Sequence, residues 1–327
     1  MQNHKEQRRD VLQILAMVAT LAVPAFFTLR TVVETPWNAR PAENPSPLGY
    51  TVSLTLFLIP VLAIGFVHVR WPRGPVHLRS LFWATGAIAL IGFLLDIVFG
   101  YSFLTFKNAG ATIGIRLPSW DWTTLQWVPG YLPVEEFAFY ILGALFVLML
   151  YLWLNDRWLA RYDPHDIAQA AKDTPRLLNP SFRTLGVWLA LTAAGVWYKF
   201  AGPRPEGFPG YFLFIMVLGF LPTFLFLRAV SPFVNWRAFA FSYGVLLLVS
   251  LVWEATLGVP YDWWNYKYDQ MLGIEIMAWS RLPIEAVMLW MVIAWDCVIA
   301  LEIFRVFFHM ERGVKAALLG APKPAGG

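Results

Sequence analysis

Long apolar runs recur along this chain, and they constrain its fold more than any other feature. A helix needs about 20 consecutive apolar residues to cross the ~30 Å hydrocarbon core of a bilayer. Of the 327 residues, 58% are hydrophobic and 14% are charged, whereas soluble domains have about 25% charged residues. The sequence therefore predicts an all-α integral membrane protein. Eight runs are long enough to span: Val11–Leu29, Gly49–Val69, Leu81–Gly100, Pro133–Leu154, Phe182–Ala201, Tyr211–Val230, Trp236–Gly258 and Pro283–Phe308.

The first apolar run follows a basic N-terminus, as a signal peptide does. Lys5, Arg8 and Arg9 resemble the charged start of such a peptide. The run Val11–Leu29 is longer than the apolar part of a signal peptide, which has about 7–15 residues, and no clear small-residue cleavage site follows it. We therefore expect a retained helix.

Lys and Arg are unevenly distributed between the two sets of loops. Seventeen lie near the termini and between runs two and three, four and five, and six and seven, and eight lie in the other loops. Basic residues concentrate on the cytoplasmic side of membrane proteins. The sequence therefore predicts a multi-pass protein of the cell inner (cytoplasmic) membrane, with both the N-terminus and the C-terminus in the cytoplasm.

The chain divides into two similar groups of four runs. A polar linker, residues 155–181, which we expect to be cytoplasmic, separates a first repeat, residues 1–154, from a second, residues 182–327. Because four is an even number of crossings, the two repeats would be parallel, unlike the inverted repeats of many transporters. Each half has an acid near the outer end of its third run and a Pro-x-Glu motif at the start of its fourth run. These elements are Asp96 with Leu132-Pro133-Val134-Glu135-Glu136, and Glu254 with Leu282-Pro283-Ile284-Glu285-Ala286.

Several classes of function are excluded by what the sequence lacks. It has no Gly-x-Gly-x-x-Gly after a strand and no Walker loop, which argues against nucleotide or flavin binding. Its five histidines are scattered without the spacing of a metal site. The single cysteine, Cys297, excludes a disulfide scaffold, and the apolar composition excludes a soluble nucleic-acid binder. We therefore expect a protein that works without a cofactor or metal.

Five acids lie a few residues inside the predicted extracytoplasmic boundary: Asp96, Glu135, Glu136, Glu254 and Glu285. An acid at the centre of a transmembrane helix costs about 2.5–3.5 kcal/mol, so each needs a reason. For the three glutamates that begin helices, capping is an alternative, because an acid in the first turn complements the helix dipole. Asp96 and Glu254 lie near the C-terminal ends of their helices, where negative charge is unfavourable, although snorkelling to the interface stays open. Because both halves have the same arrangement, we expect the five acids to converge and form a functional cluster.

Three further acids lie in the last run or just after it. Asp296 follows Glu285 by 11 residues and so lies nearly on the same helical face. A buried hydrogen bond to another helix explains it as well as catalysis does. Glu302 and Glu311 lie near or beyond the basic cytoplasmic end, and we expect both to be solvated.

Aromatic residues crowd the same two outer loops as the acids. The interfacial aromatic belt of membrane proteins is one explanation for them. A cation in an apolar cavity would also be stabilised by ring faces, which makes these rings candidates for binding a substrate that becomes cationic. The candidates for substrate binding are Trp122, Trp127, Trp253, Trp264, Tyr266 and Trp279.

Two stretches resemble one known family. Pro133-Val134-Glu135-Glu136 resembles the Pro-x-Glu-Glu signature of the integral-membrane lycopene cyclase domain, found in heterodimeric bacterial and archaeal carotenoid cyclases and in a fungal fusion with phytoene synthase. The stretch from Trp253-Glu254-Ala255 through Gly258, Trp264 and Tyr266 to Leu282-Pro283-Ile284-Glu285 resembles the acid–Gly–Trp–Tyr…Pro-x-Glu run of the same domain. The chain departs from the family in having Ala286 in place of a second acid, no Trp beside Asp96, and an additional helix in each half.

The resemblance implies a carotenoid cyclase that closes the ends of a linear carotenoid into rings without redox change. Its implied substrate is a hydrophobic isoprenoid within the lipid bilayer, and association with other carotenoid-pathway enzymes is a further expectation. Glu135 or its counterpart Glu285, kept neutral by burial, would protonate the terminal alkene. The neighbouring alkene would close a six-membered ring, and Asp96 or Glu254 would remove a proton. Three alternatives stay open: a carotenoid hydratase, another membrane terpene cyclase, and a proton-coupled transporter.

Overall fold

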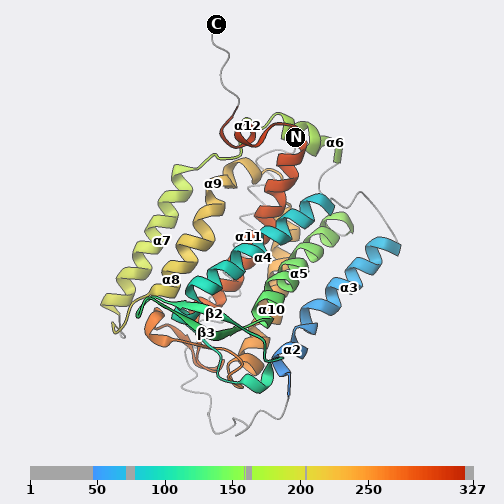
Figure 1. The fold of residues 1–327 in the computed structure, drawn as a ribbon. Helices are drawn as coiled ribbons and strands as arrows, with labels where there is room; N and C mark the ends of the chain where they lie inside the picture. Colours follow the sequence, from blue (N-terminus) through green and yellow to red (C-terminus); the bar gives the residue numbers. More distant parts are fainter. Residues whose placement is uncertain (1–46, 71–77, 158, 160–163, 203–204, 321–327) are drawn as a thin grey trace.

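The computed structural model describes residues 47–70, 78–157, 159, 164–202 and 205–320, and the chain is mostly helical over these ranges (Figure 1). Six helical stretches are long and apolar enough to cross a membrane, and they coincide with six of the eight predicted spans. This supports the prediction of a multi-pass helical membrane protein. The six are Gly49–Arg70, Leu78–Phe103, Glu135–Arg157, Gly210–Val230, Trp236–Gly258 and Ile284–Met310.

The other two predicted spans have different outcomes. Val11–Leu29 lies outside the described residues. The run Phe182–Ala201 forms a 20-residue helix, α7, with the predicted bounds, and the hydroxyl of its N-cap Ser181 accepts a hydrogen bond from the Thr184 N–H at 3.4 Å. However, α7 is not among the six helices that are apolar enough to span. Its charged and indole-bearing residues lower its mean hydropathy, so the count of eight stays a prediction.

Three of the six stretches are divided into shorter elements. The first consists of α2 (Gly49–Ser53) and α3 (Thr55–Arg70), and the fourth consists of α8 (Gly210–Phe214), the π-helical η3 (Ile215–Phe220) and α9 (Leu221–Val230). The fifth consists of α10 (Trp236–Trp253) and the π-helical η4 (Glu254–Gly258). The continuous helices are α4 (Leu78–Phe103), α5 (Glu135–Arg157) and α11 (Ile284–Met310). Because π-helical turns are frequent at functional sites, the one that begins at Glu254 is notable.

The helices α5 and α11 form the centre of the bundle. α5 packs against α3, α4, α10 and α11, and α11 packs against α4, α9 and α10 as well. Of the spanning windows, that of α5 is the most buried, at 61%, whereas that of α2–α3 is 17% buried. The outer face of α3 exposes Ile59, Leu62 and Phe66, and side chains of this kind suit contact with lipid rather than water.

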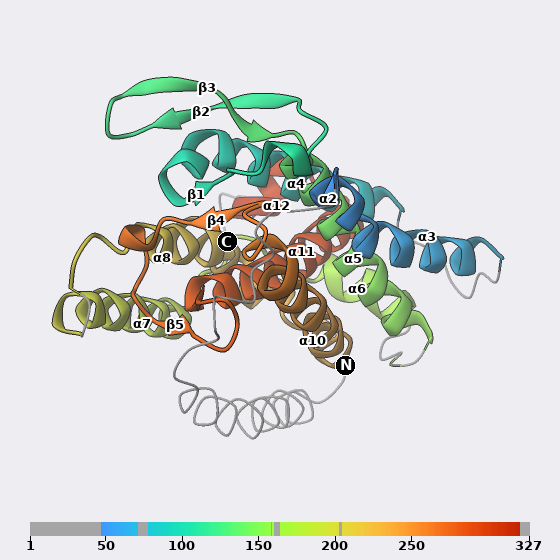
Figure 2. The same ribbon diagram turned by 90° about the horizontal axis from the view of Figure 1, so that it is seen from below.

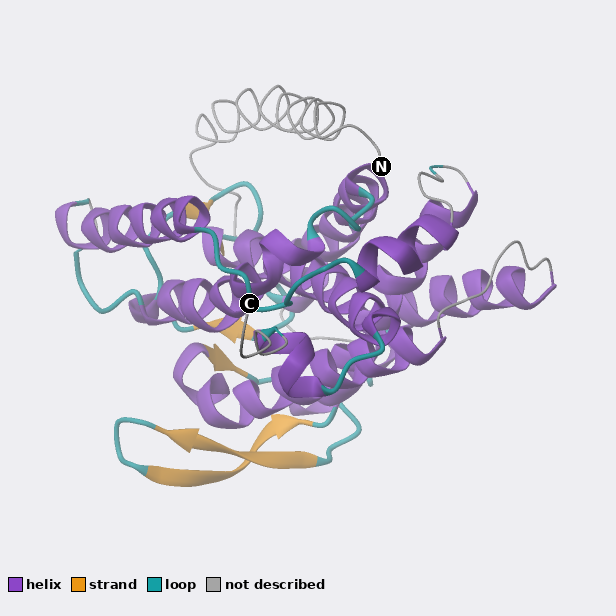
Figure 3. Cartoon of the chain, turned by 90° about the horizontal axis from the view of Figure 1, so that it is seen from above, coloured by secondary structure: helices purple, strands orange, loops and turns teal. Residues whose placement is uncertain are grey.

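The two ends of the bundle are built differently. At one end lie α6 (Pro164–Lys172) and α12 (Val314–Leu319), and we call this the α12 end (Figure 1). The N–H of Leu177 donates to the carbonyl of Ala317 there, at 2.8 Å. At the other end, which we call the loop end, the segments 104–134 and 259–283 form short strands and turns. A hairpin at this end lies along one side of the bundle, beside α4 (Figures 2 and 3).

The strands at the loop end require a correction to the predicted all-α fold. β2 (Arg116–Asp121) pairs with β3 (Gln126–Pro133) in an antiparallel hairpin that places Trp120 opposite Trp127. Cross-strand aromatic pairs of this kind stabilise hairpins. Two-residue strands make the other pairs, β1 (Leu104–Thr105) with β4 (Asn265–Tyr266), and β5 (Glu275–Ile276) with β6 (Leu282–Pro283). The pairing of β1 with β4 joins the two loop segments, far apart in sequence.

Candidate active site

A pocket lies at the loop end, and elements from both halves of the chain contribute to it. It encloses about 630 Å³ of space between atoms, counting the part that opens outward. α4 contributes Asp96, α5 contributes Glu136 and η4 contributes Glu254. All three side chains are buried. Three of the five acids predicted from the sequence therefore line one pocket.

Tyrosine hydroxyls hold two of these acids. The Tyr50 hydroxyl donates to Glu136 Oε1 at 2.7 Å, and the Tyr266 hydroxyl donates to Glu254 Oε1 at 2.9 Å. Burial and the Glu254 carboxyl raise the pKa of Tyr266 well above its ordinary value, so this hydroxyl stays protonated and able to donate. The Tyr140 hydroxyl and the Glu136 carboxyl are the polar neighbours of Asp96.

The remaining oxygens of these acids are poorly compensated. Asp96 Oδ2 and Glu254 Oε2 are buried and have no hydrogen-bond partner among the described residues. The described residues that line the pocket include no Lys or Arg. Burying a carboxylate is costly unless it is paired and hydrogen-bonded. Acids placed at such a cost in a membrane segment are candidates for function.

Aromatic rings form the wall of the pocket. Trp253 and Trp264 lie with their ring centroids 4.5 Å apart, and Tyr50 lies 5.1 Å from Trp264. On the other side, Phe139 contacts Trp290 in an edge-to-face arrangement at 5.4 Å. These rings are all buried. A positive charge that develops inside the pocket would therefore meet ring faces as well as carboxyl oxygens.

Gly258 allows one of these rings to reach its place. A Cβ at this position would lie 2.1 Å from an atom of the Trp264 ring, so no side chain fits between η4 and the indole. The acid and the glycine recur at the same spacing in α4, as Asp96 and Gly100, where a Cβ would lie 2.9 Å from Leu132. The glycine of each acid–glycine pair thus lets a loop side chain pack against its helix.

The two other predicted acids, Glu135 and Glu285, do not line the pocket. Glu135 Oε1 accepts hydrogen bonds from the backbone N–H of Ile113 at 2.7 Å and from the Thr51 hydroxyl at 2.6 Å. Glu285 Oε1 accepts from the backbone N–H of Leu272 at 2.5 Å. These contacts hold a loop against each helix start. Both glutamates also lie in the first turn of their helices, which is the position that the capping alternative requires.

The loops held by these two glutamates share a pattern of backbone contacts. The residue after each bonded N–H is a glycine with positive φ, 85° at Gly114 and 87° at Gly273. The carbonyl of the next residue accepts a backbone hydrogen bond from the start of the following helix. Ile115 accepts from Val134, just before α5, at 3.0 Å, and Ile274 accepts from Ile284, the first residue of α11, at 2.9 Å. Each loop also accepts a backbone hydrogen bond from the segment that leads into another helix. The Gly110 carbonyl accepts from the residue before α2, and the Asp269 carbonyl accepts from the segment before α8.

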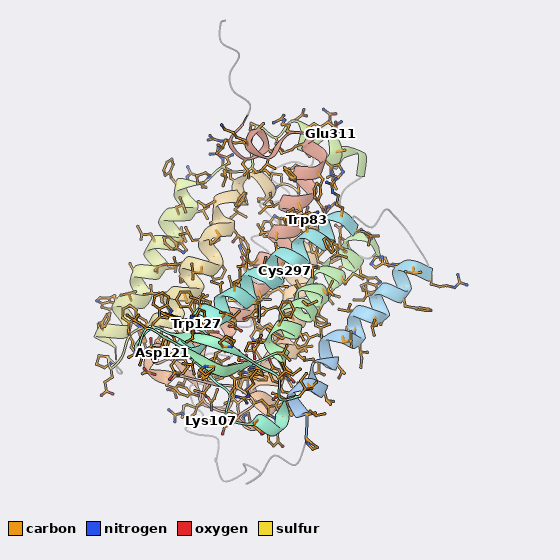
Figure 4. The ribbon with its side chains drawn as sticks, viewed as in Figure 1. Trp83, Lys107, Asp121, Trp127, Cys297 and Glu311 are labelled. Carbon is orange, nitrogen blue, oxygen red and sulfur yellow. The ribbon has the colours of Figure 1, made fainter. Side chains whose placement is uncertain are left out.

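The six predicted substrate-binding residues divide equally. Trp253, Trp264 and Tyr266 line the pocket. Trp122 and Trp127 belong to the hairpin region, are 50% and 56% exposed and lie outside the pocket lining. Trp127 is labelled at the hairpin in Figure 4. Trp279 is also outside the lining, in the turn between β5 and β6, where its N–H donates to the Ile276 carbonyl at 3.0 Å.

The pocket lining also includes residues that were not predicted, among them Tyr50, Tyr140, Tyr211 and Trp290. A signal for these four exists in the sequence. Tyr50 and Tyr211 each follow a glycine at the start of a span, and Tyr140 and Trp290 each come four residues after the last position of a Pro-x-Glu-(Glu/Ala) motif. Comparing the two halves position by position would have found both pairs.

The acids outside the pocket have separate surroundings. Asp296 Oδ1 accepts a hydrogen bond from the Thr223 hydroxyl at 3.1 Å, which is the interhelical contact considered for it. The prediction that Glu302 is solvated is wrong, because its side chain is 0% exposed and lies 2.8 Å from Arg305. Glu311 is exposed as predicted, at the α12 end, 3.2 Å from Lys172 (Figure 4).

Comparisons of the chain with protein-family models, with curated proteins and with solved structures gave no match.

Proposed function

We propose that this chain is a cofactor-independent cyclase of the lycopene type, which isomerises an acyclic isoprenoid end group into a ring. The observation that carries the proposal is the meeting of Asp96, Glu136 and Glu254 in a ring-lined pocket whose described lining residues include no Lys or Arg. Acid-initiated cyclisation needs a proton donor, a base and an environment that tolerates a carbocation. The pocket supplies groups suited to all three.

The reaction proceeds by moving one proton in and one proton out. Asp96 and Glu136 are neighbours in the pocket. One of their two carboxyls, in its neutral form, adds its proton to the terminal double bond of the substrate, which leaves a tertiary cation. The π electrons of the neighbouring alkene attack that cation, close a six-membered ring and move the charge to a ring carbon. A carboxylate, for which we assign Glu254, removes a proton from the adjacent carbon to leave the ring alkene. The product is an isomer of the substrate, and no electron acceptor is used.

This assignment moves the proton donor from Glu135 and Glu285 to the acids that line the pocket. One carboxyl oxygen of each, Oε1, accepts a hydrogen bond from a backbone N–H of a loop, and neither side chain lines the pocket. The aromatic wall excludes water, which would otherwise capture the cation as an alcohol. A hydratase would use the same protonation and then admit water, so the nature of the product separates these two functions.

We further propose that the two halves are parallel four-span repeats, residues 1–154 and 182–327, joined by the linker 155–181. The matched loop contacts around Gly114 and Gly273 support this duplication. The bias of Lys and Arg supports an inner-membrane protein with both termini in the cytoplasm.

Mass spectrometry of pigments from lycopene-producing cells that express the chain tests the function. A new pigment isomeric with lycopene is expected, and it should disappear in an Asp96→Asn variant present in the membrane at the same level. A product heavier by one water would identify a hydratase. Unchanged lycopene would overturn the proposal.

A further inference from the structure

The pocket is enclosed by buried residues on most sides, but not on all. Its acids and indoles are buried. The half-buried lining residues are Phe99 of α4, Leu104 of β1, Tyr140 of α5, Phe214 of α8 and Leu289 of α11. The half-buried lining residues of α4 and α8 are apolar, and we infer that the pocket opens between these two helices. We call Phe99, Phe214 and Leu289 the mouth.

Rings alone bridge α4 and α8 at the mouth. The ring centroids of Phe99 and Phe214 are 5.5 Å apart, and Phe103 lies 5.3 Å from Phe214 and 5.1 Å from Tyr211. α4 packs mainly against α5, α11 and the β2–β3 hairpin. Side-chain rotation can therefore open this side of the pocket without moving a packed helix, since rotamer changes are fast and local.

The mouth lies within the depth of the membrane. Phe99 comes four residues before the end of α4, and Phe214 comes four residues after the start of α8. At 1.5 Å per residue, each ring belongs to a residue about 6 Å inside the end of its span. This depth corresponds to the boundary between lipid headgroups and acyl chains, so the mouth faces lipid rather than water.

Trp122 marks the same boundary beside the mouth. Its indole N–H donates to the Val98 carbonyl at 2.9 Å, and its ring stacks on Phe99 at 5.7 Å. The ring is nevertheless 50% exposed. A Trp with one polar contact and an exposed apolar ring is typical of the membrane interface. It fixes one side of Phe99 and leaves the side toward Phe214 free to move.

We propose that Phe99 and Phe214 form a lateral entry for a linear isoprenoid hydrocarbon. The end group lies in the pocket, and the rest of the chain passes between these rings into the bilayer. This inference rests on the proposed function for the identity of the occupant. The residues at the mouth are apolar, as a hydrocarbon chain requires, whereas the acids lie deeper, where the reactive end would arrive. A substrate dissolved in the bilayer then reaches the site without crossing water.

Reversible bridging of the mouth tests the proposal. Cys297 is the chain's one cysteine, so a Cys297→Ser background carrying Phe99→Cys and Phe214→Cys has two thiols. A bis-methanethiosulfonate reagent joins them through disulfides, and dithiothreitol releases them. Lycopene is added to the purified protein in vesicles either before or after bridging, and the pigment retained after repurification in detergent is measured by its absorbance.

The expected result depends on the order of the two steps. Bridging first should reduce the retained pigment to about a tenth by slowing association, and bridging last should retain pigment that washing removes from unbridged protein. Reduction should abolish both effects. The matched control is Phe220→Cys with Phe224→Cys, whose rings lie 5.8 Å apart along one helical stretch and outside the pocket lining, and bridging this pair should have no effect.

Retention that is the same whichever step comes first would overturn the proposal. Conversion of lycopene in cells is scored separately. If conversion occurs but the order of bridging has no effect, the lateral entry is wrong and the cyclase stands. If the order matters but no conversion occurs, the entry stands and the cyclase is wrong.

Discussion

Two groups of buried acids lie toward opposite ends of the central helices α5 and α11, and they are compensated in opposite ways. At the loop end, Asp96, Glu136 and Glu254 share a pocket whose described lining includes no cation. At the α12 end, Glu302 pairs with Arg305 at 2.8 Å, with the two side chains 0% and 5% exposed. Both sites are buried, but among the described residues only the second has a cation beside its acid.

The acid at the α12 end belongs to a network that joins three helices. Glu302 of α11 accepts a hydrogen bond from the Tyr151 hydroxyl of α5 at 2.9 Å, and that hydroxyl accepts one from the Asn235 N–H at 2.9 Å. The Asn235 side chain in turn caps α10 by accepting from Ala238. The guanidinium and the tyrosine hydroxyl hold the Glu302 carboxyl in a fixed place. The two sites therefore differ in the described partner of the buried acid, which is a guanidinium at the α12 end and a tyrosine hydroxyl for Glu136 and Glu254 at the loop end.

The largest effect should come from an acid of the pocket. Glu136→Gln keeps the size of the side chain and its contact with Tyr50 but removes the exchangeable proton. We expect the rate of cyclisation to fall about 10²–10⁴-fold, the usual contribution of general acid–base catalysis. Product formation by purified enzyme in vesicles measures this, and the thermal unfolding midpoint should stay within a few degrees. Glu311→Gln, at the exposed α12 end, is the control and should react at the normal rate.

Removing the cation at the α12 end should affect stability instead. Arg305→Met leaves Glu302 buried without its partner, which should lower the free energy of unfolding by about 3–5 kcal/mol. Thermal unfolding in detergent measures the loss, and the rate per folded molecule should not change. The double variant with Glu302→Met should recover much of the stability, because no charge is left unpaired. A double variant as unstable as the single one would show that the ion pair is not the cause.

Adjacent glutamates provide a finer form of the same comparison. Glu135→Gln retains a carbonyl oxygen that can accept from Ile113 and Thr51, as the carboxylate does. We therefore expect the rate to fall by less than about tenfold, which corresponds to less than the ~1.4 kcal/mol that a hydrogen bond contributes. The same assay compares Glu135→Gln with Glu136→Gln. Equal losses in the two variants would contradict the division between a holding and a reacting glutamate.

The sequence predicted six of the spans and the gathering of three of the acids because both follow from short-range patterns. The lengths of apolar runs set where helices begin and end, and the repeated Pro-x-Glu places Glu135 and Glu285 at matching helix starts. It could not separate Glu135 from Glu136, because consecutive residues point about 100° apart on a helix and the packing of α5 decides which one faces the pocket. That packing depends on α4, α10 and α11, which come from distant parts of the chain.

Long-range contacts also explain the other differences from the sequence prediction. Glu302 lies near basic residues in the sequence, which suggested exposure, but Tyr151 and Asn235 cover it from 151 and 67 residues away. Similarly, the hairpin carries Trp122 and Trp127 onto the outside of α4, whereas Trp264 from the other loop enters the pocket beside Gly258. Composition made these tryptophans equivalent candidates, and the close approach allowed by one glycine distinguishes them.

The smallest predicted effect concerns the hydroxyl that holds Glu254. Tyr266→Phe keeps the ring in the pocket and removes the donor at 2.9 Å. The loss of one hydrogen bond to an acid, about 1 kcal/mol, should lower kcat about fivefold and leave KM nearly unchanged, because the bond orients a reacting group and does not bind the apolar substrate. Tyr131→Phe is the matched control, since its hydroxyl donates to the Leu104 carbonyl in the same loop region. If Tyr266 only supported packing, Tyr266→Phe and Tyr131→Phe would lower kcat by similar, small amounts. A fall in kcat confined to Tyr266→Phe, with an altered pH profile of kcat, would place Glu254 among the reacting acids and complete the contrast with Glu302.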